Sequence, residues 1–208
     1  MTKQNIFNYK FENYNKELNF FVNETNLYAF NGLIKSNSKL LFLYGPKKSG
    51  KTFLGKIWLN KNNAFEYKNN FEFIIKNKKN VLIDNLLAHD QEYVFHIVND
   101  CILNNLEILI ISDLKLNNIV FKYNDLASRL RTFTILEIDQ PNDDMLLNIL
   151  MKLLIDKQFI INTNDIFEYI LRRVDRSYQG IHDIVNKLDV LSLEKKRQLT
   201  IPLIKEIL

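Results

Sequence analysis

The chain has 208 residues, of which 47% are hydrophobic and 25% charged, and its net charge is +4 at neutral pH. This length and apolar content suit one compact α/β domain with a small appendage. The charge excess is mild, so it permits acidic partners but does not by itself indicate nucleic-acid binding. No apolar run approaches the roughly 20 residues that cross a bilayer, which argues against a membrane protein.

The cysteine content and the amino terminus indicate the compartment. Cys101 is the single cysteine, so it cannot form an intramolecular disulfide and does not make a metal site. The first residues are polar and show no signal-peptide core. We therefore expect a cytoplasmic protein.

Short apolar runs alternate with helical patterns through the first two thirds of the chain. Runs at 40–44, 80–84, 107–112 and 133–138 predict strands, and 52–59 and 91–103 predict helices. This alternation predicts a parallel sheet covered by helices on both faces. Residues 1–20 show no clear period and are expected to form a tail that orders on a partner.

After Pro141 the pattern is helical and no strand is indicated. Helices are expected from 142 through 153, from a cap at Asn164 or Asp165, over 178–191, and as a short final element beginning near Pro202. The sequence thus predicts three parts: a tail over 1–20, an α/β nucleotide-binding base over 21–140, and a small helical lid over 141–208.

One segment matches the phosphate-binding pattern G-x-x-x-x-G-K-[ST], between an expected strand and an expected helix. Glycines let such a loop curl so that backbone N–H groups and the helix N-terminus point at phosphates. The lysine reaches the β- and γ-phosphates, and the hydroxyl faces Mg²⁺. The alternative is a lysine-rich turn without a ligand. The eight residues are Gly45, Pro46, Lys47, Lys48, Ser49, Gly50, Lys51 and Thr52.

A carboxylate follows the second apolar run. Asp84 at the end of a parallel strand would lie beside the P-loop and hold the water shell of Mg²⁺, unless it only caps a helix. The next residue is Asn85, whose amide cannot accept a proton as a general base does. We expect a site that holds nucleotide and hydrolyses it slowly, unless Asp90 or Glu92 substitutes.

Four blocks resemble the AAA+ domain of the bacterial initiator DnaA, and more closely its short homologues of the Hda type. They are the P-loop and its helix at 45–58, the acidic motif at 83–85, an arginine-finger box at 125–130, and the closing segment 199–208. The resemblance implies an AAA+ base with a helical lid that binds ADP or ATP with Mg²⁺. It also implies DnaA and the DNA polymerase sliding clamp as partners, and stimulation of ATP hydrolysis on DnaA as the role.

The resemblance assigns further residues. Arg129 would be the finger supplied in trans, with a surface ion pair to Asp125 and a role for Arg131 as the alternatives. In the tail, Gln4, Ile6, Phe7 and Tyr9 look like a clamp-binding peptide, although Asn5 stands where a leucine is common and a disordered tail is the alternative.

Three more positions surround the nucleotide in this resemblance. Phe21 and Val22 would frame the adenine, with plain packing as the alternative. Asp113 falls at the sensor 1 position, with capping as the alternative. The lid arginine called sensor 2 is replaced by Gln179, so either Arg176 reaches the phosphates or the lid reads the nucleotide weakly. The three histidines, His89, His96 and His182, show no ligand-like pattern and are expected to be structural or exposed.

These expectations support one leading hypothesis and two others. The first is a nucleotide-bound regulator of replication initiation, the second an adaptor that recruits a partner without promoting hydrolysis, and the third an autonomous ATPase, which Asn85 argues against. Because the chain stops after the lid, no sequence-specific DNA-binding module is expected. The sequence leaves open whether the chain forms a homo-oligomer.

Overall fold

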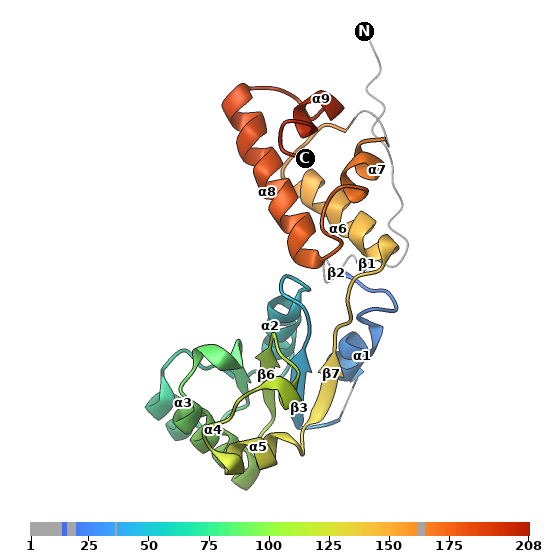
Figure 1. The fold of residues 1–208 in the computed structure, drawn as a ribbon. Helices are drawn as coiled ribbons and strands as arrows, with labels where there is room; N and C mark the ends of the chain where they lie inside the picture. The colour runs from blue at the N-terminus through green and yellow to red at the C-terminus, as the bar shows by residue number, and fades with distance from the viewer. Residues whose placement is uncertain (1–13, 16–19, 36, 162–164) are drawn as a thin grey trace.

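The computed structural model describes residues 14–15, 20–35, 37–161 and 165–208. Its base is built on a parallel five-stranded sheet in the order β4-β5-β6-β3-β7 (Figure 1). The strands are β3 (Leu40–Tyr44), β4 (Phe65–Glu66), β5 (Val81–Ile83), β6 (Ile108–Ser112) and β7 (Thr134–Glu137). The expected α/β class with a parallel sheet is confirmed.

Both faces of the sheet are covered, because alternate residues of each central strand enter different cores. Phe42 and Ile110 pack toward α3 (Phe71–Asn77), α4 (Gln91–Leu103) and α5 (Asn124–Leu130). Leu43 and Ile111 pack on the other face toward α1 (Leu27–Lys35) and α2 (Lys51–Lys61). This period of two within fully apolar runs is why the sequence shows the strands as continuous hydrophobic stretches.

The lid consists of α6 (Asp143–Asp156), α7 (Asp165–Leu171), α8 (Tyr178–Lys195) and α9 (Ile201–Ile204). It has its own core, which includes Leu150, Ile170 and Leu188. Met145 and Tyr178, near the first turns of α6 and α8, instead belong to the core of the base. The lid is therefore anchored at the end of the base by the amino-terminal ends of two of its helices (Figure 1).

Caps define where the lid helices begin. The side chains of Asn142, Ser177 and Thr200 accept backbone N–H groups at the starts of α6, α8 and α9. Such caps satisfy amides that have no partner inside the helix. The short strands β1 (Tyr14–Asn15) and β2 (Phe20–Phe21) pair antiparallel near the lid. Among the described residues, no helix is both long and apolar enough to cross a membrane.

Candidate functional site

The loop between β3 and α2 has the shape that the P-loop pattern predicts. Gly50 has φ +92°, a left-handed conformation that favours glycine, and a Cβ there would lie 2.7 Å from the ring of Phe20. A Cβ on Gly45 would lie 2.7 Å from the carbonyl oxygen of Ile138. The two glycines therefore let the loop pass close to the backbone of Ile138 at one end and to the ring of Phe20 at the other.

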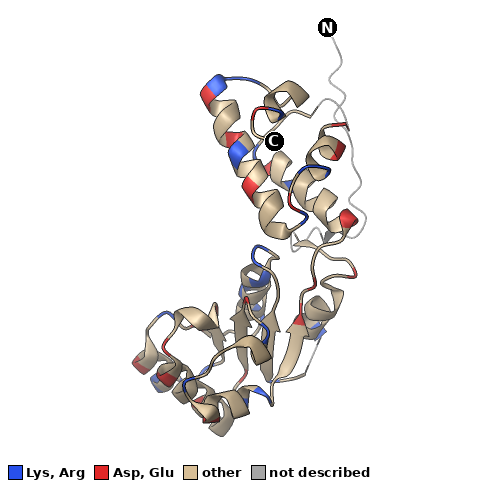
Figure 2. Ribbon diagram, in the orientation of Figure 1, with Lys and Arg blue, Asp and Glu red and all other residues tan. Residues whose placement is uncertain are grey.

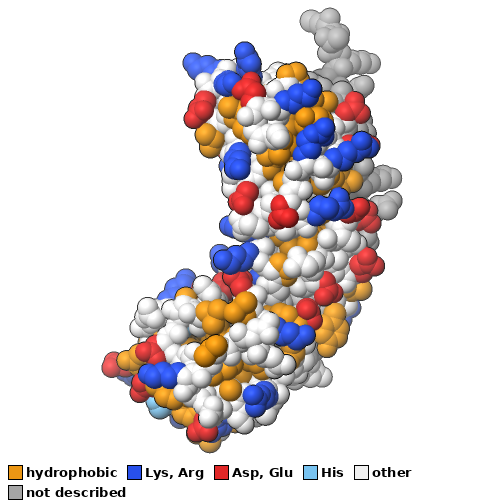
Figure 3. All heavy atoms as spheres, viewed as in Figure 1, with side chains coloured by type: hydrophobic (Ala, Val, Ile, Leu, Met, Phe, Trp, Pro, Cys, Tyr) orange, Lys and Arg blue, Asp and Glu red, His pale blue; other side chains and the backbone are white. Residues whose placement is uncertain are grey.

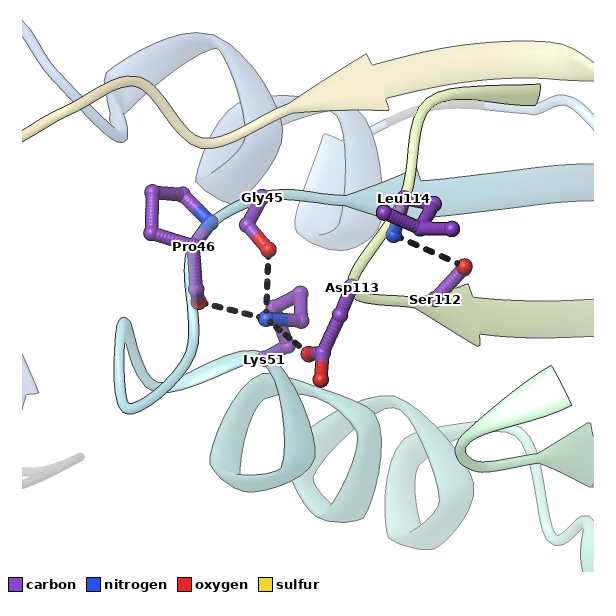
Figure 4. A network of polar contacts seen from close by, with 6 residues as sticks. All are labelled: Gly45, Pro46, Lys51, Ser112, Asp113 and Leu114. Atoms are coloured by element: carbon purple, nitrogen blue, oxygen red, sulfur yellow. Dashed lines mark hydrogen bonds and ion pairs between the residues drawn. The ribbon is translucent and has the colours of Figure 1, made fainter. Parts of the chain in front are cut away.

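Lys51, the first residue of α2, is buried at the mouth of this loop. Its Nζ donates to the carbonyl oxygens of Gly45 at 2.8 Å and Pro46 at 2.6 Å. It also pairs with Oδ1 of Asp113 at 3.0 Å (Figure 4). Asp113 follows β6, so the ends of two neighbouring strands hold the ammonium group in place. Phosphate oxygens are acceptors of the same kind and would compete for these donors.

One polar group in the loop lacks a partner. Among the described residues, the hydroxyl oxygen of Ser49 is buried without a hydrogen bond. A buried polar atom of this kind costs free energy unless something else satisfies it. The first amides of α2 also have no acceptor within the helix and carry the positive end of its dipole. The loop therefore fits a phosphate group.

Two groups beside the loop suit a divalent cation. Thr52 is exposed on the first turn of α2, and Asp84 follows β5; both line the same cleft as Ser49. A hydroxyl and a carboxylate are the ligands that Mg²⁺ uses together with phosphates. Among the described residues, no three His, Cys, Asp or Glu side chains gather to hold a metal by themselves. The donor set thus fits a cation brought in with a phosphate.

No general base stands next to Asp84. Asn85 lies in the cleft with a left-handed φ of +55°. Of the two expected substitutes, Asp90 caps α4 by accepting the N–H of Glu92 at 2.9 Å. Neither Asp90 nor Glu92 is among the residues that line the cleft. Asp90 is thus engaged in capping α4, and the carboxylates of Asp90 and Glu92 both lie outside the lining of the cleft.

The cleft lies between the base and the lid and has a volume of about 830 Å³. Figure 3 shows acidic and basic side chains together on the concave side between these two parts. Of the residues expected from the sequence, the cleft brings together Lys47 through Thr52, Phe21, Asp84 and Asp113. Gly45 and Pro46 shape the loop behind it, while Val22 and Arg176 are not among its lining residues.

Aromatic and apolar groups form one wall. The rings of Phe20 and Phe53 stack with centroids 5.6 Å apart, and both line the cleft together with Phe21. Asn26, which is 2% exposed, fixes this segment by donating from Nδ2 to the carbonyl of Phe21 at 2.9 Å. Tyr178 closes the wall from the lid, and its burial raises the pKa of its phenol.

The lid side of the cleft differs from the sequence expectation. Arg176 is ion-paired with Asp143 and borders a separate hollow, together with Arg172 and Glu168. Gln179 does line the cleft, where its amide donates to Asp183 at 2.7 Å. His182 lines the cleft as well, although the sequence around this residue shows no ligand-like pattern. Its spacing of three residues from Gln179, which places both on one face of a helix, is the signal that could have found it.

Arg129 lies away from this cleft. It is on α5, which leads into the start of β7, whereas the P-loop follows the end of β3. Because β3 and β7 are parallel neighbours, these two places are at opposite edges of the sheet. The guanidinium lies over the ring of Phe95, 5.7 Å from its centroid. Within the described part of the chain, it makes no ion pair with Asp125, and Arg131 is exposed.

The remaining predicted residues fall outside the description. Gln4, Ile6, Phe7 and Tyr9 all precede the first described residue. The expected clamp-binding peptide therefore stays a prediction from the sequence.

Comparisons with known proteins agree with this architecture. A family model described as "Hda, lid domain" matches residues 144–208. The chromosomal replication initiator protein DnaA of Buchnera aphidicola is 26% identical over 235 aligned positions, covering 93% of this chain. The match covers 49% of that protein, so the chain spans about half the length of this curated relative.

Solved structures share the fold. Domain III of DnaA from Thermotoga maritima superposes with a TM-score of 0.74 and 17% identity, covering 93% of this chain and 96% of that one. AMPPCP-bound DnaA from Aquifex aeolicus gives a TM-score of 0.67 and 19% identity, covering 88% of this chain and 68% of that one. The lid match, the sequence relationship and the shared fold lead to one conclusion: the chain is an Hda/DnaA-like AAA+ protein.

Proposed function

We propose that the cleft binds an adenine nucleotide, ADP or ATP, together with Mg²⁺. The buried, unpartnered hydroxyl of Ser49 and the ammonium of Lys51 are suited to the phosphates. Phe20 and Phe21 offer aromatic surface to a base, and the similar fold of Aquifex aeolicus DnaA binds AMPPCP. Thr52 and Asp84 would hold the magnesium, which neutralises phosphate charge when bound.

The protein would hydrolyse its own nucleotide slowly. Asn85 occupies the place next to Asp84 and cannot take a proton from water. The carboxylate of Asp90 instead caps α4 by accepting the backbone N–H of Glu92. A bound nucleotide would therefore serve to hold the base and the lid together more than to drive turnover.

We further propose that the chain regulates replication initiation by stimulating ATP hydrolysis on DnaA, together with the DNA-loaded sliding clamp. The position of Arg129 carries this proposal. It is at the opposite edge of the sheet from the chain's own cleft, so its guanidinium is available to a nucleotide on another protein. A guanidinium supplied in trans neutralises charge on the transferred phosphoryl group and contributes roughly 10³–10⁵ in rate.

A single-turnover assay tests the role. DnaA is loaded with radiolabelled ATP and mixed with clamp on DNA and this protein, and the formation of ADP is followed. We expect rapid ADP formation with the wild type and with Arg131→Ala, the matched control on the same turn. We expect Arg129→Ala to bind nucleotide normally but to lose stimulation by at least roughly 10³-fold. Normal stimulation by Arg129→Ala would show that the finger is another residue.

A second function has one observation in its favour. The guanidinium of Arg129 lies over Phe95, so it already has a partner within the chain. If this contact is permanent, the protein would be an adaptor that binds nucleotide and recruits partners without promoting hydrolysis. In the same assay, an adaptor gives a flat time course while still co-sedimenting with DnaA or the clamp.

A further inference from the structure

The lid side of the cleft lacks the arginine that the family resemblance leads one to expect. Gln179 faces the cleft from the first turn of α8, and its side chain is bonded to Asp183. Arg176 is paired with Asp143 and does not line the cleft. Among the described residues that line the cleft there is no arginine. If the lid contacts a polyphosphate through a cation, another side chain must supply it.

His182 is placed to do so. It lies one helical turn after Gln179 on the same face of α8, is partly buried, and lines the cleft together with the P-loop. Burial lowers the pKa of its imidazole, the nearby ammonium of Lys48 lowers it further, and Asp183 partly opposes both effects. His182 on α8 and Lys48 of the P-loop line the same cleft, one from the lid and the other from the base. Figure 2 shows the basic loop between β3 and α2 at the end of the base nearest α8.

Other charged groups line the same cleft. The base contributes Lys47, Lys48, Lys51 and Lys56 as cations, with Asp84 and Asp113 as anions. From the lid, α6 contributes Lys152 and Asp156. His182 is the lining residue whose ordinary titration range lies near pH 6.5.

We propose that His182 is the lid's contact with the polyphosphate of the bound nucleotide, and that it takes up a proton when the nucleotide binds. This inference rests on the proposed nucleotide site. A phosphate placed between the lid and the P-loop offsets the charge of Lys48 and adds negative charge beside the imidazole. Both changes favour the imidazolium form, so the pKa of His182 rises in the complex.

The affinity for nucleotide should therefore depend on pH. Because the pKa is low in the free protein and higher in the complex, protons are absorbed on binding at pH values between the two. By linkage, the affinity for nucleotide rises as pH falls through that interval. The ligand phosphate also titrates near this range, but it does so equally with the wild type and with variants.

Proton NMR measures the titration directly, since the chain has three histidines. The imidazole signals are assigned with His182→Gln and with His96→Gln, an exposed control on α4, and followed from pH 5 to pH 8 with and without saturating MgADP. We expect the pKa of His182 to rise on saturation, while the signals of the His96 control do not respond to MgADP. A pKa of His182 that is unchanged or falls, in protein that binds MgADP, overturns the proposal and leaves the nucleotide site intact.

Calorimetric titration with MgADP gives a second readout. Relative to His182→Gln, the wild type should gain roughly two- to fivefold in affinity between pH 8 and pH 6, as expected for a rise of about one unit in one pKa from a value below the ordinary one. His96→Gln should follow the wild type. If His182→Gln keeps the full pH dependence of the wild type, the proposal is wrong. Absence of MgADP binding by the wild type would instead contradict the nucleotide site itself.

Discussion

Asn85 sets the chemistry of the site at the scale of a single side chain. It is exposed, lines the cleft and has a left-handed backbone, which asparagine and aspartate adopt more readily than other residues. Exchanging its amide for a carboxylate therefore changes the proton chemistry with little backbone strain. An alanine at the same place removes the amide without adding a base.

Asn85→Asp should convert the protein into a faster ATPase. The new carboxylate can accept a proton from water beside the phosphates, and general bases contribute up to roughly 10²–10⁴-fold. We expect at least a roughly tenfold rise in steady-state phosphate release by the isolated protein. Asn85→Ala is the control and should not exceed the wild type. Equal rates for all three proteins would mean that water is not positioned at this residue.

How far single residues could be predicted depends on whether their role is local. The P-loop could be predicted because its phosphate-binding chemistry depends on eight consecutive residues, Gly45 to Thr52. Ser112 ends β6 and Asp113 follows it, so their place at the end of the sheet could also be expected. His182 has no such local motif: its spacing from Gln179 places the two residues on one face of a helix, but which face of α8 meets the P-loop depends on how the lid packs on the base. The same holds for Arg176, whose pairing with Asp143 joins the segment before α8 to the start of α6.

Elements were predictable where they are long and regular. The helix over 91–103 was predicted with its observed ends, because its apolar residues repeat at helical spacing; in the structure Asp90 caps it. The strands β3, β5, β6 and β7 were predicted from their apolar runs. The two-residue strand β4 and the seven-residue helix α3 were not, since so few residues show no period.

Asn142 connects elements that are far apart in the sequence. Its Oδ1 accepts the N–H of Met145 at 2.9 Å, which caps α6, and also accepts a bond from Asn23 at 2.9 Å. Its Nδ2 donates to Glu24 at 2.7 Å. The segment before the P-loop is thus fastened to the start of the lid through one amide.

Asn142→Ala should therefore weaken both the fold and the site. Loss of the cap alone costs about 1 kcal/mol in the free energy of unfolding. Because the lid would be held less firmly over the cleft, MgADP should also bind more weakly. Asn148→Ala, which removes only a local bond to Asp144 within α6, is the matched control and should change stability by less than about 0.5 kcal/mol. Chemical denaturation and calorimetry measure the two effects, and identical behaviour of the two variants would contradict this role.

At the scale of the whole molecule, the proposed functions are separated in space. The cleft is at the end of the base that meets the lid, and Arg129 is at the opposite edge of the sheet. This separation arises from the parallel pairing of β3 with β7, because Arg129 precedes one of these strands and the P-loop follows the other. A separation of this kind lets each function be removed without the other.

The proposed clamp contact belongs to a third place, the amino-terminal tail. Phe7→Ala removes an aromatic side chain that would fill a pocket on the clamp, so clamp binding should weaken by at least roughly tenfold. Nucleotide binding should be unchanged. Tyr28→Ala, which removes an exposed aromatic side chain from α1, is the control and should bind clamp normally. Surface plasmon resonance on immobilised clamp measures both, and undiminished binding by Phe7→Ala would exclude this residue as the anchor.

The central claim is that the cleft binds an adenine nucleotide through the P-loop, and calorimetric titration with ADP and Mg²⁺ tests it most directly. The wild type should bind with a dissociation constant of about 10 μM or lower, which corresponds to roughly −7 kcal/mol. Lys51→Ala should fold and lose most of this affinity, because it removes the ammonium that the loop holds at its mouth. Folded wild-type protein that gives no binding signal at millimolar ADP would contradict the account.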